Sequence, residues 1–66
     1  MDTSALSQQI LCARHELLRR HVVYALDVRE GRMQQKEATY EISTMEAILS
    51  TLEHVLSFSY AMLDGN

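Results

Sequence analysis

The chain has 66 residues, a formal net charge of −3, no proline and a single cysteine, Cys12. This length allows one small domain, and one cysteine excludes an internal disulfide, so a partner subunit is the simplest further source of stability. No signal-peptide pattern is present and no run approaches the roughly 20 apolar residues that span a bilayer. We therefore expect a cytoplasmic protein of a reducing compartment, with no membrane partner.

A first helix is predicted over about residues 4–30. Thr3 or Ser4 can cap its start with a hydroxyl group, and Gly31 provides the left-handed residue that ends many helices. The apolar seam of this helix is expected to contain Leu6, Ile10, Ala13, Leu17, His21, Tyr24 and Val28. A second apolar stripe beside the seam contains Leu11, Leu18, Val22 and Ala25.

A tight turn at residues 31–33 leads to a second helix over about residues 34–63. Its seam alternates steps of four and three, as in a coiled coil, through Ala38, Ile42, Met45, Leu49, Leu52, Leu56, Ser59 and Leu63. A second apolar stripe has a spacing of seven residues and consists of Ile48, Val55 and Met62. A third face is small and polar, and we interpret it as solvated rather than packed: Ser43, Ala47, Ser50, Ser57 and Ala61, interrupted by His54.

The predicted fold class is all-α, with residues 1–66 forming one antiparallel two-helix hairpin. Two apolar stripes on each helix require two apolar neighbours, and a hairpin supplies only one. The simplest closed solution is a two-fold homodimer that forms a four-helix bundle. The predicted dimer interface consists of Leu11, Leu18, Val22, Ile48, Val55 and Met62.

Charge is divided between the two predicted helices. Residues 1–36 carry six basic and four acidic side chains, whereas residues 37–66 carry five acidic side chains and no basic one. Antiparallel packing is expected to pair Arg20 with Glu46 and Arg14 with Glu53, which favours ion pairs over a nucleic-acid surface as the role of these arginines. Three residues are left as an expected partner-binding surface on the outer face of the first helix: Arg19, Val23 and Arg29.

The sequence contains few side chains that could take part in catalysis or bind a metal. Cys12 and His15 have a spacing that suits two zinc ligands, but a structural site needs four. We therefore predict no metal, no cofactor and no catalytic residue. A pH-sensitive role is possible for His21, although a hydrogen-bonded histidine at the edge of the core is the simpler interpretation.

Several segments resemble a group of small phage and prophage proteins, mostly of unassigned function. The similarity covers residues 20–24, 28–33 and 45–49, with Ala38 and Ile42 between them. This sequence departs from the family pattern at Ala25, where proline is favoured, and at Asp27, where an aromatic residue is common. The resemblance implies a helical hairpin and a viral accessory context, and it implies no reaction.

These observations predict a non-catalytic accessory protein that binds and modulates or inhibits a host macromolecule, with a host protein favoured as the partner. The rival hypothesis is a nucleic-acid-associated regulator that uses the arginines of the first helix.

Overall fold

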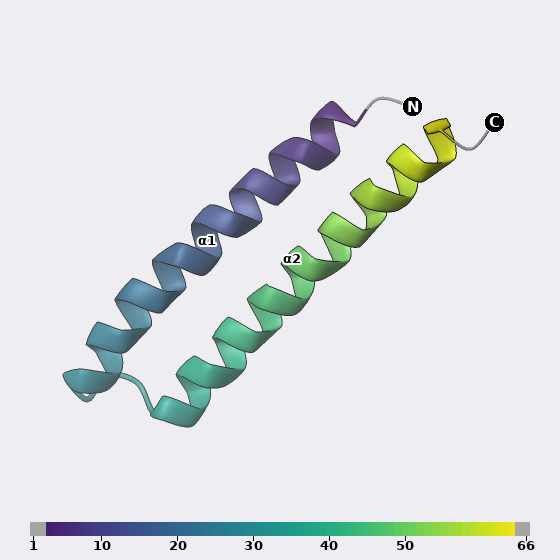
Figure 1. Ribbon diagram of the computed structural model, residues 1–66. Coiled ribbons are helices and arrows are strands. Elements are labelled where there is room, and N and C mark those ends of the chain that lie inside the picture. Colours follow the sequence, from purple (N-terminus) through teal and green to yellow (C-terminus); the bar gives the residue numbers. More distant parts are fainter. Residues whose placement is uncertain (1–2, 65–66) are drawn as a thin grey trace.

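A computed structural model describes residues 3–64 of the chain, which form two long antiparallel helices (Figure 1). Helix α1 spans Ser4–Arg29 and helix α2 spans Gln35–Asp64. The start of α1 and the end of α2 lie at the same end of the molecule, opposite the turn. The predicted all-α hairpin is confirmed, and each helix boundary lies within one residue of its predicted position.

The turn follows from a Schellman motif at the end of α1. Gly31 has a φ of 79°, its N–H donates to Val28 O at 3.1 Å, and the N–H of Arg32 donates to Asp27 O at 2.8 Å. The Arg32 side chain pairs with Glu30 at 2.8 Å and with Asp27 at 2.9 Å. These hydrogen bonds, that to Glu30 first, raise the pKa of Arg32 above its usual value. The predicted role of Gly31 is confirmed.

At the start of α1, one of the two predicted capping residues does not cap with its side chain. Thr3 occupies the N-cap position, but its side chain makes no capping hydrogen bond. Only the backbone carbonyl of Thr3 is used, which accepts a bond from the N–H of Ser7 at 2.9 Å. Hydroxyl capping by Thr3 is therefore absent.

The core is a narrow seam between the two helices. Among the described residues, the buried hydrophobic side chains are Ile10, Ala13, Ala38 and Met45. Ser59 interrupts the apolar spacing of α2 but is 5 % exposed, and its hydroxyl donates to Val55 O at 3.0 Å. That bond satisfies a polar group that would otherwise be costly to bury. The side chain of Leu63, predicted as the last seam position, lies outside the described residues.

One predicted seam position in α1 is wrong. His21 is exposed, and the half-buried Arg20 lies next to the helix contact instead. The spacing Ala13, Leu17, Arg20, Tyr24 alternates steps of four and three, which keeps a seam facing an antiparallel partner. The guanidinium of Arg20 lies 6.0 Å from the centre of the Tyr24 ring and covers it. His21 is thus turned away from the core.

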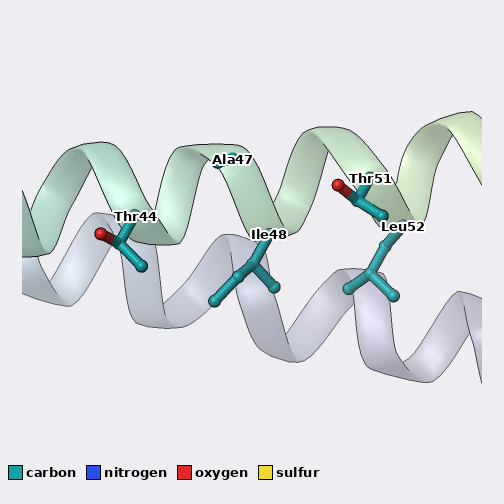
Figure 2. Close-up of a pocket in the computed structure, with 5 residues that line it drawn as sticks. All are labelled: Thr44, Ala47, Ile48, Thr51 and Leu52. Atoms are coloured by element: carbon teal, nitrogen blue, oxygen red, sulfur yellow. The ribbon is translucent and has the colours of Figure 1, made fainter.

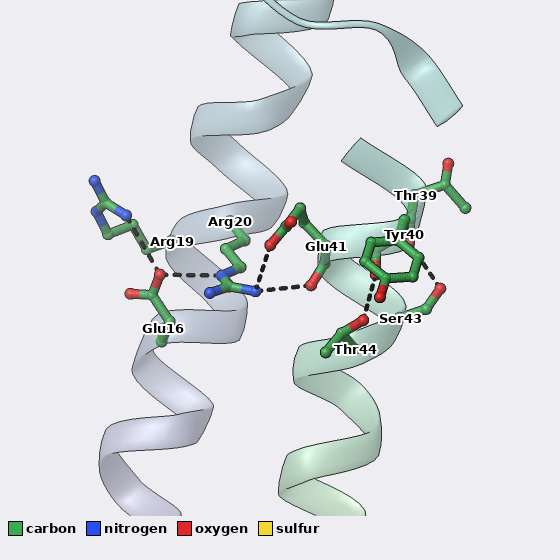
Figure 3. Close-up of polar contacts among 8 residues, drawn as sticks. All are labelled: Glu16, Arg19, Arg20, Thr39, Tyr40, Glu41, Ser43 and Thr44. Atoms are coloured by element: carbon green, nitrogen blue, oxygen red, sulfur yellow. Dashed lines mark hydrogen bonds and ion pairs between the residues drawn. The ribbon is translucent and has the colours of Figure 1, made fainter. Parts of the chain in front are cut away.

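Polar contacts link the helices across the seam (Figure 3). Arg20 donates to the backbone carbonyl of Glu41 at 2.8 Å, and its guanidinium lies 3.5 Å from the Glu41 carboxylate and 3.1 Å from that of Glu16. The predicted pair of Arg20 with Glu46 is therefore wrong, because the long arginine side chain reaches toward the turn. The predicted pair of Arg14 with Glu53 is confirmed at 2.7 Å.

The hairpin is a thin rod with a large surface for its mass. Its Cα atoms extend over 54 × 17 × 10 Å and have a radius of gyration of 15.5 Å, against about 11 Å for a compact domain of this length. Within the part of the chain that the structure describes, neither helix combines the length and apolar character needed to cross a membrane. A rod of these dimensions leaves most side chains at the surface.

Candidate interaction surfaces

Many large apolar side chains remain exposed after the two helices have packed. Among the described residues they are Leu11, Leu18, Val22, Leu26, Tyr40, Ile48, Val55, Phe58, Tyr60 and Met62. All six residues of the predicted dimer interface belong to this set. Isolated exposed hydrophobic side chains are ordinary, but stripes of them along a helix indicate an interaction site.

The first surface belongs to α1 and is called the α1 stripe: Leu11, Leu18 and Val22. Leu11 lines a shallow groove together with Ser7, Arg14 and Leu56. Leu18 lies four residues after Arg14, and Val22 follows four residues later, so both continue the same side of the helix. Leu18 and Val22 are 65 % and 66 % exposed. We call this side of the hairpin the Arg14 face.

The second surface belongs to α2 and is called the α2 stripe: Ile48, Val55 and Met62. Ile48 lines a groove between the helices with Cys12 and Glu16 on one side and Leu52 on its own helix. Val55 and Met62 follow at intervals of seven residues and therefore share the side occupied by Ile48. We call this side of the hairpin the Cys12 face.

A second hollow runs along α2 beside the α2 stripe (Figure 2). It is lined by Thr44, Ala47, Ile48, Thr51 and Leu52. The figure shows Ile48 and Leu52 projecting from α2 toward α1, with Thr51 nearby. Ile48 and Leu52 thus line both grooves.

The Arg14 face and the Cys12 face lie on opposite sides of the helix contact. Their interhelical grooves share no residue, and the buried seam residues Ile10 and Ala13 border one groove each. The predicted six-residue dimer interface is therefore two surfaces, and the prediction needs correction. The residues of each stripe are exposed as predicted. However, the spacing of residues within one helix does not show on which side of the hairpin a stripe lies, so it could not reveal that the two stripes face opposite ways. One two-fold interface uses the same patch of both subunits.

Sequence reasoning also missed Phe58 and Leu26. Phe58 is 62 % exposed and lies three residues after Val55 and four before Met62, which is the spacing of one helix face. Leu26 lies four residues after Val22 and extends the exposed part of α1 toward the turn. The signal was present in both cases, since the same spacing rule that found the stripes includes these positions.

The predicted partner-binding residues are not brought together. Arg19 is exposed and lies seven residues after Cys12, which places it on the Cys12 side of α1. Arg29 lies seven residues after Val22 and continues the α1 stripe on the other side. Val23 is half-buried rather than outward-facing. Arg19 also pairs with Glu16, at 3.4 Å. Arg29 has no acidic partner among the described residues.

Most of the positive charge is already matched by carboxylates. Arg14 pairs with Glu53, Arg19 and Arg20 with Glu16, and Arg32 with Asp27 and Glu30. The small face of α2, around Ser50 and His54, is exposed as the solvated interpretation requires. In the described chain, Arg29 and Lys36 are the cations without an ion pair. The arginines of α1 therefore do not present a continuous basic surface.

Cys12 is exposed on the Cys12 face. Within residues 3–64, no three side chains of the His, Cys, Asp and Glu types come together in a way that could hold a metal ion. The geometry of the described residues supports contact with another macromolecule through side-chain packing. No family model matches the chain, and the searches of curated proteins and of solved structures found no match either.

Proposed function

We propose that the chain is a non-catalytic accessory protein, of phage or prophage type, that binds and modulates or inhibits a host protein in the cytoplasm of the host cell. The observation that supports this proposal is the pair of exposed apolar stripes on opposite faces of one rigid hairpin. A scaffold of this kind can contact two different partners at the same time.

The α1 stripe is the surface that we assign to the target. Leu11, Leu18, Val22 and the unpaired Arg29 follow one another at intervals of seven, four and seven residues along one side of α1. Apolar side chains with an arginine at the edge are typical of protein interfaces, and a few such residues supply most of the binding energy. A rigid helix also loses little conformational freedom on binding.

A nucleic-acid target is the alternative function. The ion pairs of Arg14, Arg19, Arg20 and Arg32 weigh against it, because a matched arginine has to leave its carboxylate before it can contact a phosphate. The alternative predicts binding that weakens steeply with salt. Gel shifts of DNA and RNA at two salt concentrations therefore distinguish the two functions, and tight salt-dependent binding would favour the regulator.

Capture from a bacterial host lysate tests the main proposal, with the intact chain as bait. Leu18→Glu places a charge in the middle of the α1 stripe and should abolish capture of a specific protein. His54→Glu changes an exposed residue on the solvated side of α2 and should leave capture unchanged. Equal capture by both variants, or no specific capture by the wild-type chain, would contradict the proposal.

A further inference from the structure

The half of the Cys12 face next to the chain ends is free of charge. Between Thr3 and Ala13, α1 carries no acidic or basic side chain, and α2 carries none between Glu53 and Asp64 apart from His54. Val55, Phe58 and Met62 lie in this half, and Ile48 shares a groove with Gln9 and Cys12 of α1. Depletion of charge around exposed aromatic and aliphatic side chains is typical of the centre of a protein interface.

The accessible area shows how much surface remains to be covered. The chain exposes 5014 Å². A compact monomer of this mass exposes about 4,300 Å², so the hairpin has an excess of about 700 Å². A stable interface covers about 800 Å² on each partner. No described side chain is fully enclosed in the hairpin, so an added apolar partner would widen a core that now consists of one seam.

The Arg14 face is less suited to self-association. The ion pair between Arg14 and Glu53 crosses it, and Ser50 and Ser57 lie three and four residues from Glu53 on the same side of α2. Burying this ion pair and the neighbouring hydroxyl groups would carry a desolvation penalty. Among the described residues, the half of the Cys12 face next to the chain ends has no ion pair to bury. The polarity of the two faces therefore selects one of them.

We propose that a second copy of this chain docks on the Cys12 face about a two-fold axis and forms a four-helix bundle. The α2 stripe, Phe58 and Cys12 become buried between the two hairpins, and the α1 stripe stays on the outside. The network of Glu16, Arg19, Arg20 and Glu41 marks the polar edge of the interface toward the turn (Figure 3). This inference does not depend on the proposed host target.

A matched pair of variants tests the assignment, with the dimer dissociation constant measured by sedimentation equilibrium. Val55→Glu adds a charge to the α2 stripe and should raise that constant by at least about 100-fold, because two unpaired carboxylates would be buried in each dimer. Leu18→Glu adds the same charge on the opposite face and should leave the constant unchanged. A monomeric wild-type chain, or dissociation caused by Leu18→Glu, would overturn the proposal.

A second measurement does not depend on the folding of any variant. Cys12 is exposed in the single hairpin but covered in the proposed dimer. Its reaction with a thiol reagent should be slow at high protein concentration and should accelerate on dilution below the dissociation constant. A rate equal to that of an exposed cysteine at every concentration would contradict the proposal. Failure of host-protein capture would leave both results intact, so the two proposals can fail separately.

Discussion

The turn half and the terminal half of the hairpin are stabilised differently. Near the turn, Arg20 reaches Glu41 across the helices and Arg32 closes the end of α1. Toward the chain ends, the ion pair of Arg14 with Glu53 is the one that links the helices among the described residues, while Val55, Phe58 and Met62 remain exposed. Polar contacts thus set the register of the helices near the turn, while exposed apolar side chains occur in both halves.

This difference indicates how stability and binding are divided along the rod. Exposed ion pairs contribute only about 0.2–1 kcal/mol each, so the buried seam dominates the free energy of unfolding in both halves. The terminal half carries Val55, Phe58 and Met62, which belong to the surface that we assign to a second copy of the chain. The comparisons below require a fixed protein concentration, because association would add to the apparent stability.

The largest effect is expected from shortening a seam residue in the terminal half. Ile10 is one of the few buried apolar side chains, so Ile10→Ala should lower the free energy of unfolding by about 2–4 kcal/mol. Urea denaturation followed by circular dichroism measures the change. Leu26→Ala, at an exposed position of the same helix, is the control and should cost less than about 1 kcal/mol. Equal losses would show that α1 is not packed as described.

The contact of Arg20 with the backbone of α2 is expected to be the strongest polar contribution. Arg20→Ala removes a part-buried charged donor from the Glu41 carbonyl and should lower the free energy of unfolding by about 1–2 kcal/mol. Arg19→Ala removes only an exposed pair within α1 and should change it by less than about 0.5 kcal/mol. The same denaturation measurement compares the two variants, and a larger loss for Arg19→Ala would refute the described network.

The turn provides a backbone test. A Cβ atom on Gly31 would meet no atom within 4 Å, so Gly31→Ala introduces only the conformational penalty of a positive φ. We expect a loss of about 1 kcal/mol, seen as a lower melting temperature with an unchanged helical spectrum. Ser50→Ala, inside α2, should instead be neutral or slightly stabilising. A neutral Gly31→Ala would mean that α1 does not end in the observed Schellman motif.

The smallest effect is expected for the ion pair of the terminal half. A double-mutant cycle with Arg14→Ala and Glu53→Ala should give a coupling energy of about 0.2–1 kcal/mol. Both side chains are about half exposed, so the coupling should decrease as salt is raised. A coupling that is large and independent of salt would indicate that the Arg14 face is buried against a partner, which would contradict the face assignment.

Much of the fold can be predicted from the sequence for identifiable reasons. The steps of four and three through Ala38, Met45 and Ser59 place the seam of α2, and Gly31 marks the end of α1. Apolar spacing cannot decide whether position 20 or position 21 belongs to the seam of α1, since neither arginine nor histidine is apolar. The choice depends on Glu41, whose carbonyl lies within reach of Arg20 and across the turn.

The relative orientation of the stripes is the main feature that spacing within single helices did not reveal. Leu18 and Val55 are equally clear as stripe positions, yet they lie on opposite faces because the helices run antiparallel. The direction of each side chain follows from the geometry of its own helix. Whether two side chains on different helices lie on the same face of the hairpin depends on how the two helices pack. This distinction changes one expected interface into two surfaces, which we assign to different partners.

Light scattering of the intact chain, measured over a range of micromolar concentrations, tests the central claim most directly. The Cys12→Ser variant is measured beside it to exclude disulfide-linked pairs. Two chains of 7.6 kDa should give a particle of about 15 kDa for both proteins, and this mass should fall on dilution. A folded helical particle of 7.6 kDa at every concentration would contradict the account.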